Sequence, residues 1–180
     1  MEAYSLNQMV GFLPATRILH QNLGLLQMLD LTSVKFRKQS QNYFVTKFHP
    51  RFNEVDSYKV VWNGHYVNYF EEARTSLCRN FGISLDALAD LGFYLPVYKY
   101  NVTMRKPIFL DDEMHVCVRP NFTNPTVFEF QHLIMVKDEV RVTGSVQQVA
   151  LSKETGQIMF ELPKEVLKFL TPLYEAFTNG

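Results

Sequence analysis

The segment with the most chemical potential lies near the middle of the chain, where carboxylate, amide and imidazole side chains follow one another closely. Glu54 and Asp56 precede a short apolar run, and that run leads directly into Asn63 and His65 at the start of a predicted helix. Carboxylates and imidazoles can transfer protons, and the first turn of a helix presents backbone N–H groups that stabilise negative charge. By spacing alone, a solvated loop or capping carboxylate is the favoured role of Asp56, and Asn63 is equally an N-cap.

The helix that must position these groups runs from about Gly64 to Phe81. Its apolar residues recur at the helical spacing of three and four and so share one face: Tyr66, Phe70, Ala73, Leu77 and Phe81. Gly82 follows where a C-terminal cap belongs. Ser84 can cap a short second helix through Leu91.

Alternating segments on both sides of the helix predict strands. One precedes it, and the others follow it with tight turns between them: Tyr43–Phe48, Leu95–Met104, Glu113–Phe122, Val127–Val136, Val140–Ser152 and Gln157–Glu161. The predicted class is therefore α+β, with one long amphipathic helix wrapped by a curved antiparallel sheet. Pro163 opens a final helix, which Pro172 is expected to end or kink.

These elements divide the chain into three parts. Residues 39–163 form one domain, 164–180 a C-terminal helix, and 1–38 an N-terminal extension. Helical spacing between Ile18 and Leu29 favours a loosely packed helix in that extension. An organelle-targeting segment and translation from an upstream start codon are the alternatives.

The composition narrows the classes of function. The 18 Lys+Arg balance the 18 Asp+Glu, so the chain has no global nucleic-acid footprint. No apolar run is long enough to span a bilayer and no signal peptide is evident, which makes the cytoplasm the expected location. Cys78, Cys117 and the histidines lack metal-ligand spacing, so we expect reduced cysteines and no metal.

The central segment resembles a known family. Its pattern is an Asp, a Val-Val pair, a polar residue, a Tyr and then Tyr-Phe-Glu-x-Ala-Arg, which appears here as Asp56, Val60-Val61, Asn63, Tyr66 and residues 69–74. This resembles the 4-hydroxybenzoyl-CoA thioesterase family of the hot-dog superfamily. The turn at 105–113 and the hairpin at 153–156 extend the resemblance over about residues 43–163.

The resemblance implies a hot-dog fold and hydrolysis of an acyl-CoA or acyl-carrier-protein thioester to acid and thiol. Asp56 would be the nucleophile or general base, with Glu54 as its rival, and the amide near Asn63 would hold the oxyanion. His65 would assist proton transfer. Other residues would bind the substrate, with Trp62 and Tyr66 lining the acyl pocket and Arg105 and Lys106 contacting coenzyme A phosphates.

The resemblance also implies a homo-oligomer, a dimer or tetramer, formed through the open edge of the sheet with the acyl pocket at the seam. No cofactor is expected beyond the coenzyme A of the substrate. The many Phe and Tyr residues favour a medium or long fatty chain, or an aromatic acyl group, over acetyl. The pair Glu71 and Arg74 is expected to form an ion pair on the helix.

Two departures keep other functions open. Many family members have Gly between the Asp and the Val-Val pair, where this chain has Tyr58-Lys59. That difference mildly favours a non-catalytic protein that binds acyl thioesters. His65 stands where a small residue or Asn is usual, which keeps a hot-dog hydratase or dehydratase as a further alternative.

Overall fold

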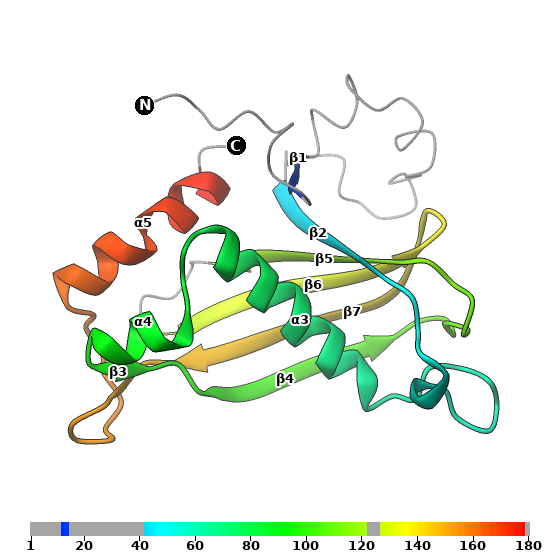
Figure 1. Cartoon of the computed structure of the whole chain (residues 1–180), viewed down its shortest axis with the longest axis horizontal. Coiled ribbons are helices and arrows are strands. Elements are labelled where there is room, and N and C mark those ends of the chain that lie inside the picture. Colours follow the sequence, from blue (N-terminus) through cyan, green and yellow to red (C-terminus); the bar gives the residue numbers. More distant parts are fainter. Residues whose placement is uncertain (1–11, 15–41, 122–126, 179–180) are drawn as a thin grey trace.

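The computed structural model describes residues 12–14, 42–121 and 127–178, and it packs one long helix across an antiparallel sheet (Figure 1). Each strand pairs antiparallel with its neighbours, in the order β1-β2-β5-β6-β7-β4. The strands are β1 (Phe12–Pro14), β2 (Asn42–Phe48), β4 (Val97–Met104), β5 (Met114–Asn121), β6 (Val127–Val136) and β7 (Glu139–Val149). The predicted α+β arrangement of a helix against an antiparallel sheet is confirmed.

The remaining elements lie around this core. They are the 3-10 helix η3 (Phe52–Glu54), the helices α3 (His65–Asn80), α4 (Leu85–Asp90) and α5 (Lys164–Thr178), and the two-stranded pair β3 (Phe93–Tyr94) with β8 (Leu151–Ser152). In Figure 1, η3 lies at the end of the sheet where α3 begins, and α4 lies at the opposite end. No helix among the described residues is long and apolar enough to span a membrane.

The helix α3 forms because its apolar residues recur on one face, and that face is buried against the sheet. The buried side chains of α3 are Tyr66, Tyr69, Phe70, Ala73 and Leu77. They join valines and isoleucines of β5, β6 and β7 in a single cluster. Burial of large side chains is worth about 1.5–3 kcal/mol each, so this face fixes α3 against the sheet. Phe81, predicted on the same face, is partly buried against the cluster.

The ends of the helices follow the local signals in the sequence. Gly82 has φ +70°, and the Ile83 N–H donates to the Cys78 carbonyl at 2.9 Å, which is the predicted C-terminal cap of α3. The Ser84 hydroxyl accepts a hydrogen bond from the Ala87 N–H at 3.1 Å and caps α4. Both predictions are confirmed.

Near the C-terminus one prediction is wrong, and a second is wrong in one of its two alternatives. Residues 157–161 do not form a strand, because Ile158 makes only a single bridge to Leu151. The helix α5 is not ended by Pro172, which lies within Lys164–Thr178. Burial of Val166 and Leu173 against the domain offsets the backbone hydrogen bond that a proline removes. The helix expected between residues 18 and 29 lies outside the described residues.

Candidate functional site

Asp56 lies at the start of a tight turn between Val55 and Val61, which pair as an antiparallel bridge. Its backbone N–H donates to the Val60 carbonyl at 2.9 Å, and its Oδ1 accepts the Tyr58 N–H at 2.8 Å. Asp56 Oδ1 is thus used by the turn, whereas Oδ2 has no hydrogen bond within the described part of the chain. The carboxylate therefore combines a structural role with one oxygen that stays available.

The turn keeps the conformation that glycine favours although this chain has no glycine there. Lys59 has φ +63° and donates its N–H to the Asp56 carbonyl at 2.9 Å. Left-handed backbone is readily adopted by Gly and costs other residues about 1–2 kcal/mol. The Tyr58-Lys59 departure from the family pattern therefore leaves the shape of the turn intact.

Backbone hydrogen bonds fix this hairpin to its surroundings on both sides. The Trp62 N–H donates to the Glu54 carbonyl at 2.9 Å, and the Val61 N–H donates to the Ile108 carbonyl at 2.8 Å. Val60 also forms a bridge with Phe109. The segment that precedes α3 is consequently held between η3 and the loop that follows β4.

The N-terminus of α3 begins directly after this hairpin and is open. Gly64 is the N-cap and no side chain caps the helix. The backbone N–H groups of Asn63 and Gly64 have no acceptor within the described residues. A Cβ at Gly64 would lie 2.0 Å from the Trp62 ring, so glycine allows that ring to pack on the backbone of the helix start. Unpaired N–H groups at a helix N-terminus can bind an oxyanion.

Tyr66 and His65 complete the group that the structure brings together. Tyr66 is buried, and burial together with the nearby Asp56 carboxylate raises the pKa of its hydroxyl, which therefore stays protonated. The His65 Nδ1 lies 3.2 Å from the Asn68 Nδ2, and its ring meets the Trp62 ring edge-on at 5.6 Å. The rings of Trp62, His65 and Tyr66 therefore lie together at the start of α3.

Glu54, the rival of Asp56, has a different environment. It is only 9% exposed, and its Oε2 accepts the Tyr69 hydroxyl at 2.6 Å and the Arg51 N–H at 2.7 Å. Burial opposes ionisation, but the two hydrogen bonds together with the nearby Arg51 charge hold the pKa of Glu54 below its usual value. Burial and the Glu54 hydrogen bond also raise the pKa of Tyr69. The hydrogen bonds of Glu54 thus hold the fold together. No local sequence signal links Glu54 to Tyr69.

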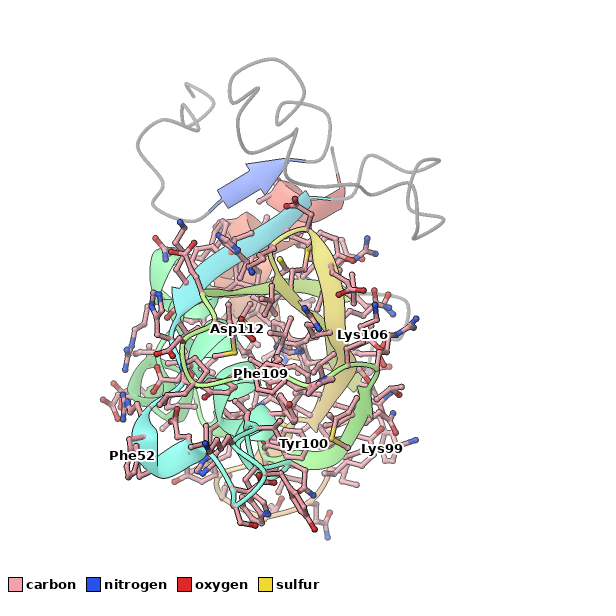
Figure 2. The ribbon with its side chains drawn as sticks, turned by 90° about the vertical axis from the view of Figure 1, so that its right-hand side faces the viewer. Phe52, Lys99, Tyr100, Lys106, Phe109 and Asp112 are labelled. Carbon is pink, nitrogen blue, oxygen red and sulfur yellow. The ribbon has the colours of Figure 1, made fainter. Side chains whose placement is uncertain are left out.

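Arg105 and Lys106 lie on the loop after β4, shortly before Ile108, whose carbonyl accepts the Val61 N–H. The Arg105 N–H donates to the Arg141 carbonyl at 2.8 Å, and the Lys106 Nζ forms an ion pair with Glu139. Figure 2 shows Lys106 well separated from Phe52 of η3 in this end-on view. Lys106, which was expected to contact a coenzyme A phosphate, is therefore already paired with Glu139.

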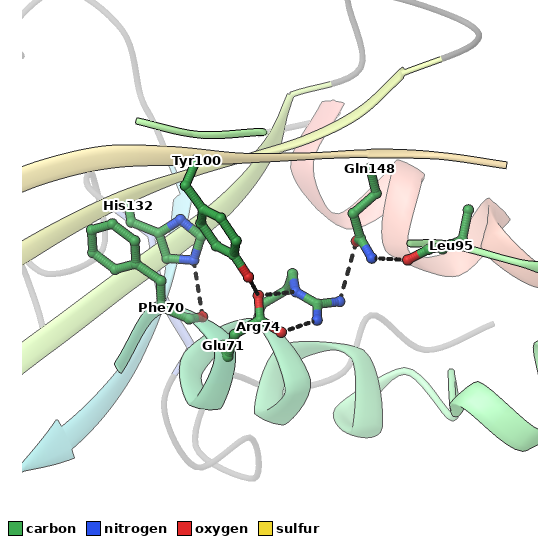
Figure 3. Close-up of polar contacts among 7 residues, drawn as sticks. All are labelled: Phe70, Glu71, Arg74, Leu95, Tyr100, His132 and Gln148. Carbon is green, nitrogen blue, oxygen red and sulfur yellow. Dashed lines mark hydrogen bonds and ion pairs between the residues drawn. The ribbon is translucent and has the colours of Figure 1, made fainter. Parts of the chain in front are cut away.

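Further along α3, polar side chains form a hydrogen-bonded network. The sequence predicted only one pair of it, Glu71 with Arg74. Glu71 accepts from Arg74 at 2.5 Å and from the Tyr100 hydroxyl at 2.9 Å, and Arg74 donates to Gln148 at 3.2 Å (Figure 3). The expected ion pair between Glu71 and Arg74 is present. Gln148 and Tyr100 come from the sheet, so only the tertiary structure adds them.

His132 is a fully buried imidazole beneath α3. Its Nε2 lies 3.2 Å from the Phe70 carbonyl, its Nδ1 lies 3.1 Å from the Phe130 carbonyl, and its ring stacks on Phe70 at 4.4 Å (Figure 3). Burial lowers the pKa of His132 to about 3. The ring is therefore neutral at physiological pH. No three His, Cys, Asp or Glu side chains gather as a metal site among the residues that the structure describes.

Comparison with known proteins identifies the family of this chain. A family model described as "Thioesterase-like superfamily" matches residues 50–170. A relative from Aquifex aeolicus, named "Putative esterase", is 28% identical over 127 residues, covering 71% of this chain and 97% of the relative. A Synechocystis relative of the same description is 31% identical over 116 residues, covering 63% of this chain and 70% of the relative.

Solved structures share the fold. A DHNA-CoA thioesterase from Staphylococcus aureus superimposes with a TM-score of 0.65 at 23% identity, covering 74% of this chain and 89% of that chain. A hypothetical protein from Aquifex aeolicus superimposes with a TM-score of 0.63 at 26% identity, covering 71% and 98%. The predicted hot-dog fold is thereby confirmed.

Proposed function

Because this chain belongs to the thioesterase-like superfamily, we propose that it hydrolyses the thioester of an acyl-CoA or acyl carrier protein to free acid and thiol. The observation that carries the proposal is the position of the Asp56 hairpin directly before an uncapped helix N-terminus. A carboxylate and a set of unpaired N–H groups are the two components that acyl transfer to water requires.

The proposed reaction uses the substrate and water alone. The thioester carbonyl oxygen accepts hydrogen bonds from the N–H groups near Asn63. Asp56 takes a proton from a water molecule, whose oxygen attacks the carbonyl carbon. The C–S bond then breaks, and the thiolate leaves and receives the proton. Direct attack by Asp56, followed by hydrolysis of the resulting anhydride, is the variant of the same scheme.

The neighbouring side chains have supporting roles in this proposal. Trp62 and Tyr66 contact the thioester end of the acyl group, because both lie at the start of α3. His65 assists proton transfer to the leaving thiol. Arg105 binds a coenzyme A phosphate, and Lys106 does so when it exchanges Glu139 for that phosphate. The same two basic residues would serve the phosphopantetheine of a carrier protein.

The contacts of His65 favour a thioesterase over a hydratase or dehydratase. Such an enzyme needs an imidazole hydrogen-bonded to an acidic side chain, whereas among the described residues His65 has its side-chain hydrogen-bond contact with Asn68. His65 is therefore assigned an auxiliary role.

We also propose that two copies of the chain associate through β4. This strand lies at the edge of the sheet, and most of its side chains are exposed, including Tyr98, Tyr100 and Met104. An open edge with large apolar side chains is suited to pair with a second copy. Sedimentation measurements on the protein would give a monomer mass if this is wrong.

The test of the function is thiol release from a panel of acyl-CoAs, from acetyl to palmitoyl and including benzoyl. Replacing Asp56 by Asn should lower kcat by about 10²–10⁴-fold while the fold is retained. Asp112→Asn is the matched control, because the Asp112 Oδ2 also accepts a turn N–H, from Phe109 at 2.8 Å.

The outcomes separate the alternatives. Full turnover by Asp56→Asn would show that Asp56 is not a catalytic residue. Absence of thiol release from every acyl-CoA by the unmutated protein, together with tight binding of one of them, would favour the non-catalytic binding protein. An equal loss in Asp112→Asn would point to loop stability rather than catalysis.

A further inference from the structure

A cavity lies at the opposite end of the sheet from the proposed reaction centre. Its volume is about 410 Å³, and it is lined by the C-terminal half of α3, by α4, α5 and β6. Apolar side chains make much of its wall, namely Ile83, Leu88, Leu95, Phe128, Leu170 and Leu173. Sites for small molecules commonly enclose about 300–1,000 Å³, so this cavity is large enough for a ligand.

The polar side chains on one side of the cavity already have partners. The Arg74 guanidinium is bound by Glu71 at 2.5 Å and by Gln148 at 3.2 Å, and the Gln148 amide donates to the Leu95 carbonyl (Figure 3). An apolar ligand would not break these contacts or leave a buried polar atom unsatisfied. Arg79, Ser84 and Asp86 also line the cavity but are exposed, so the buried part of the wall is mainly apolar and favours an apolar chain.

The position of the cavity along α3 suggests what that chain is. Thr75 and Cys78 contribute to its wall, and the helical rise places them about 16–21 Å beyond Gly64. An extended chain advances about 1.2 Å per bond, so about 13–17 bonds connect the two places. That is the length of a long saturated fatty acyl chain.

We propose that this cavity holds the distal part of the fatty acyl chain of the substrate, whose thioester lies at the N-terminus of α3. The inference rests on the proposed function for the identity of the ligand, but binding to the cavity is measurable without turnover. It names the substrate class as long-chain acyl thioesters rather than acetyl or aromatic ones.

The two cysteines provide a direct probe of occupancy. Cys78 lines the cavity, whereas Cys117 lies in a separate buried cluster with Leu133 and Met135. Burial raises the pKa of the Cys78 thiol to about 11, so alkylation by iodoacetamide is followed at alkaline pH. Mass spectrometry then gives the rate of modification of each cysteine in the presence of fatty acids of increasing length.

The expected result is shielding of Cys78 that depends on chain length. Hexadecanoate and tetradecanoate should slow its alkylation at least tenfold and butyrate should not, with apparent affinity rising roughly tenfold for every two methylenes. The Cys117 rate should stay constant. Equal rates for Cys78 with and without every fatty acid would overturn the proposal.

A pair of variants tests the same cavity by filling it. Leu170→Trp places a bulky indole ring in the wall, and Leu167→Trp is its control one turn earlier on α5, where Leu167 is 51% exposed. Leu170→Trp should weaken hexadecanoate binding at least tenfold and Leu167→Trp should not. If Leu170→Trp does not fold, the shielding of Cys78 in the unmutated protein decides alone.

The two proposals fail separately. Shielding of Cys78 by hexadecanoate without thiol release from any acyl-CoA would sink the thioesterase proposal and keep the cavity as a site for fatty chains. Thiol release from long acyl-CoAs with no shielding, or equal hexadecanoate binding by Leu170→Trp and Leu167→Trp, would sink the cavity proposal alone.

Discussion

The Tyr69 hydroxyl donates a 2.6 Å hydrogen bond to the carboxylate of Glu54, and this bond ties α3 to the residues that lead into the Asp56 hairpin. Both side chains are buried, and a hydrogen bond to a charged acceptor is stronger than one between neutral groups. The contact thus fixes the distance between the helix and the hairpin that carries the candidate catalytic carboxylate.

Tyr69→Phe should therefore reduce both stability and turnover. We expect the free energy of unfolding to fall by about 1–3 kcal/mol, measured by urea denaturation, and kcat to fall because the hairpin is held less firmly. The low pKa of Glu54 stabilises the fold above the ordinary carboxyl pKa, and this contribution is lost as pH falls. The variant should consequently unfold at a higher pH on acidification. A loss no larger than that of Tyr98→Phe, whose exposed hydroxyl contacts Gln147, would contradict this role.

Lys59→Gly should stabilise the hairpin. Lys59 adopts φ +63°, which a side chain disfavours and glycine does not. Glycine also increases the entropy of the unfolded chain, so the net gain in unfolding free energy should be at most about 1 kcal/mol. The neighbouring Tyr58→Gly should instead destabilise, because Tyr58 does not have a positive φ. Thermal unfolding of both variants checks the prediction, which is wrong if the two shifts have the same sign.

Gly64→Ala should disturb the site more than the fold. An added Cβ would lie 2.0 Å from the Trp62 ring, so the ring must move, and its 53% exposure leaves room for that movement. Gly64 has φ −64°, which alanine adopts readily, and unfolding free energy should change by less than about 1 kcal/mol. Trp62 is the one tryptophan of the chain, so its fluorescence reports the movement directly. An unchanged emission spectrum would show that the ring does not pack on Gly64 in solution.

His132 should make the protein less stable in acid. Burial depresses its pKa to about 3 from an ordinary value of 6.5, so between these values the unfolded chain binds a proton that the folded protein does not. Stability from this group is complete above pH 6.5 and falls as pH falls toward 3, by at most about 1.4 kcal/mol per pH unit. His132→Leu should flatten the dependence of unfolding free energy on pH across this window. His49→Leu, at an exposed position, should leave the dependence as it is, and matching slopes in the two variants would refute the assignment.

Local patterns in the sequence determined much of the fold and part of the site. The helical spacing of Tyr66, Phe70 and Leu77 predicted α3, and the signals at Gly82 and Ser84 predicted its end and the next cap. These predictions succeeded because the information lies within a few residues. Residues 157–161 show the limit, since their pairing with residues 150–152 ends after one bridge and two backbone hydrogen bonds.

The order of residues 54–66 likewise placed Asp56, Asn63 and Tyr66 together, because a short hairpin leads directly into a helix. Only the tertiary structure decided that Glu54 is held by Tyr69 and that Lys106 is paired with Glu139. The tertiary structure alone also forms the cavity between α3, α4 and α5, because residues far apart in the chain make up its wall. Such contacts depend on how α3, α5 and the sheet pack, and no local spacing records that packing.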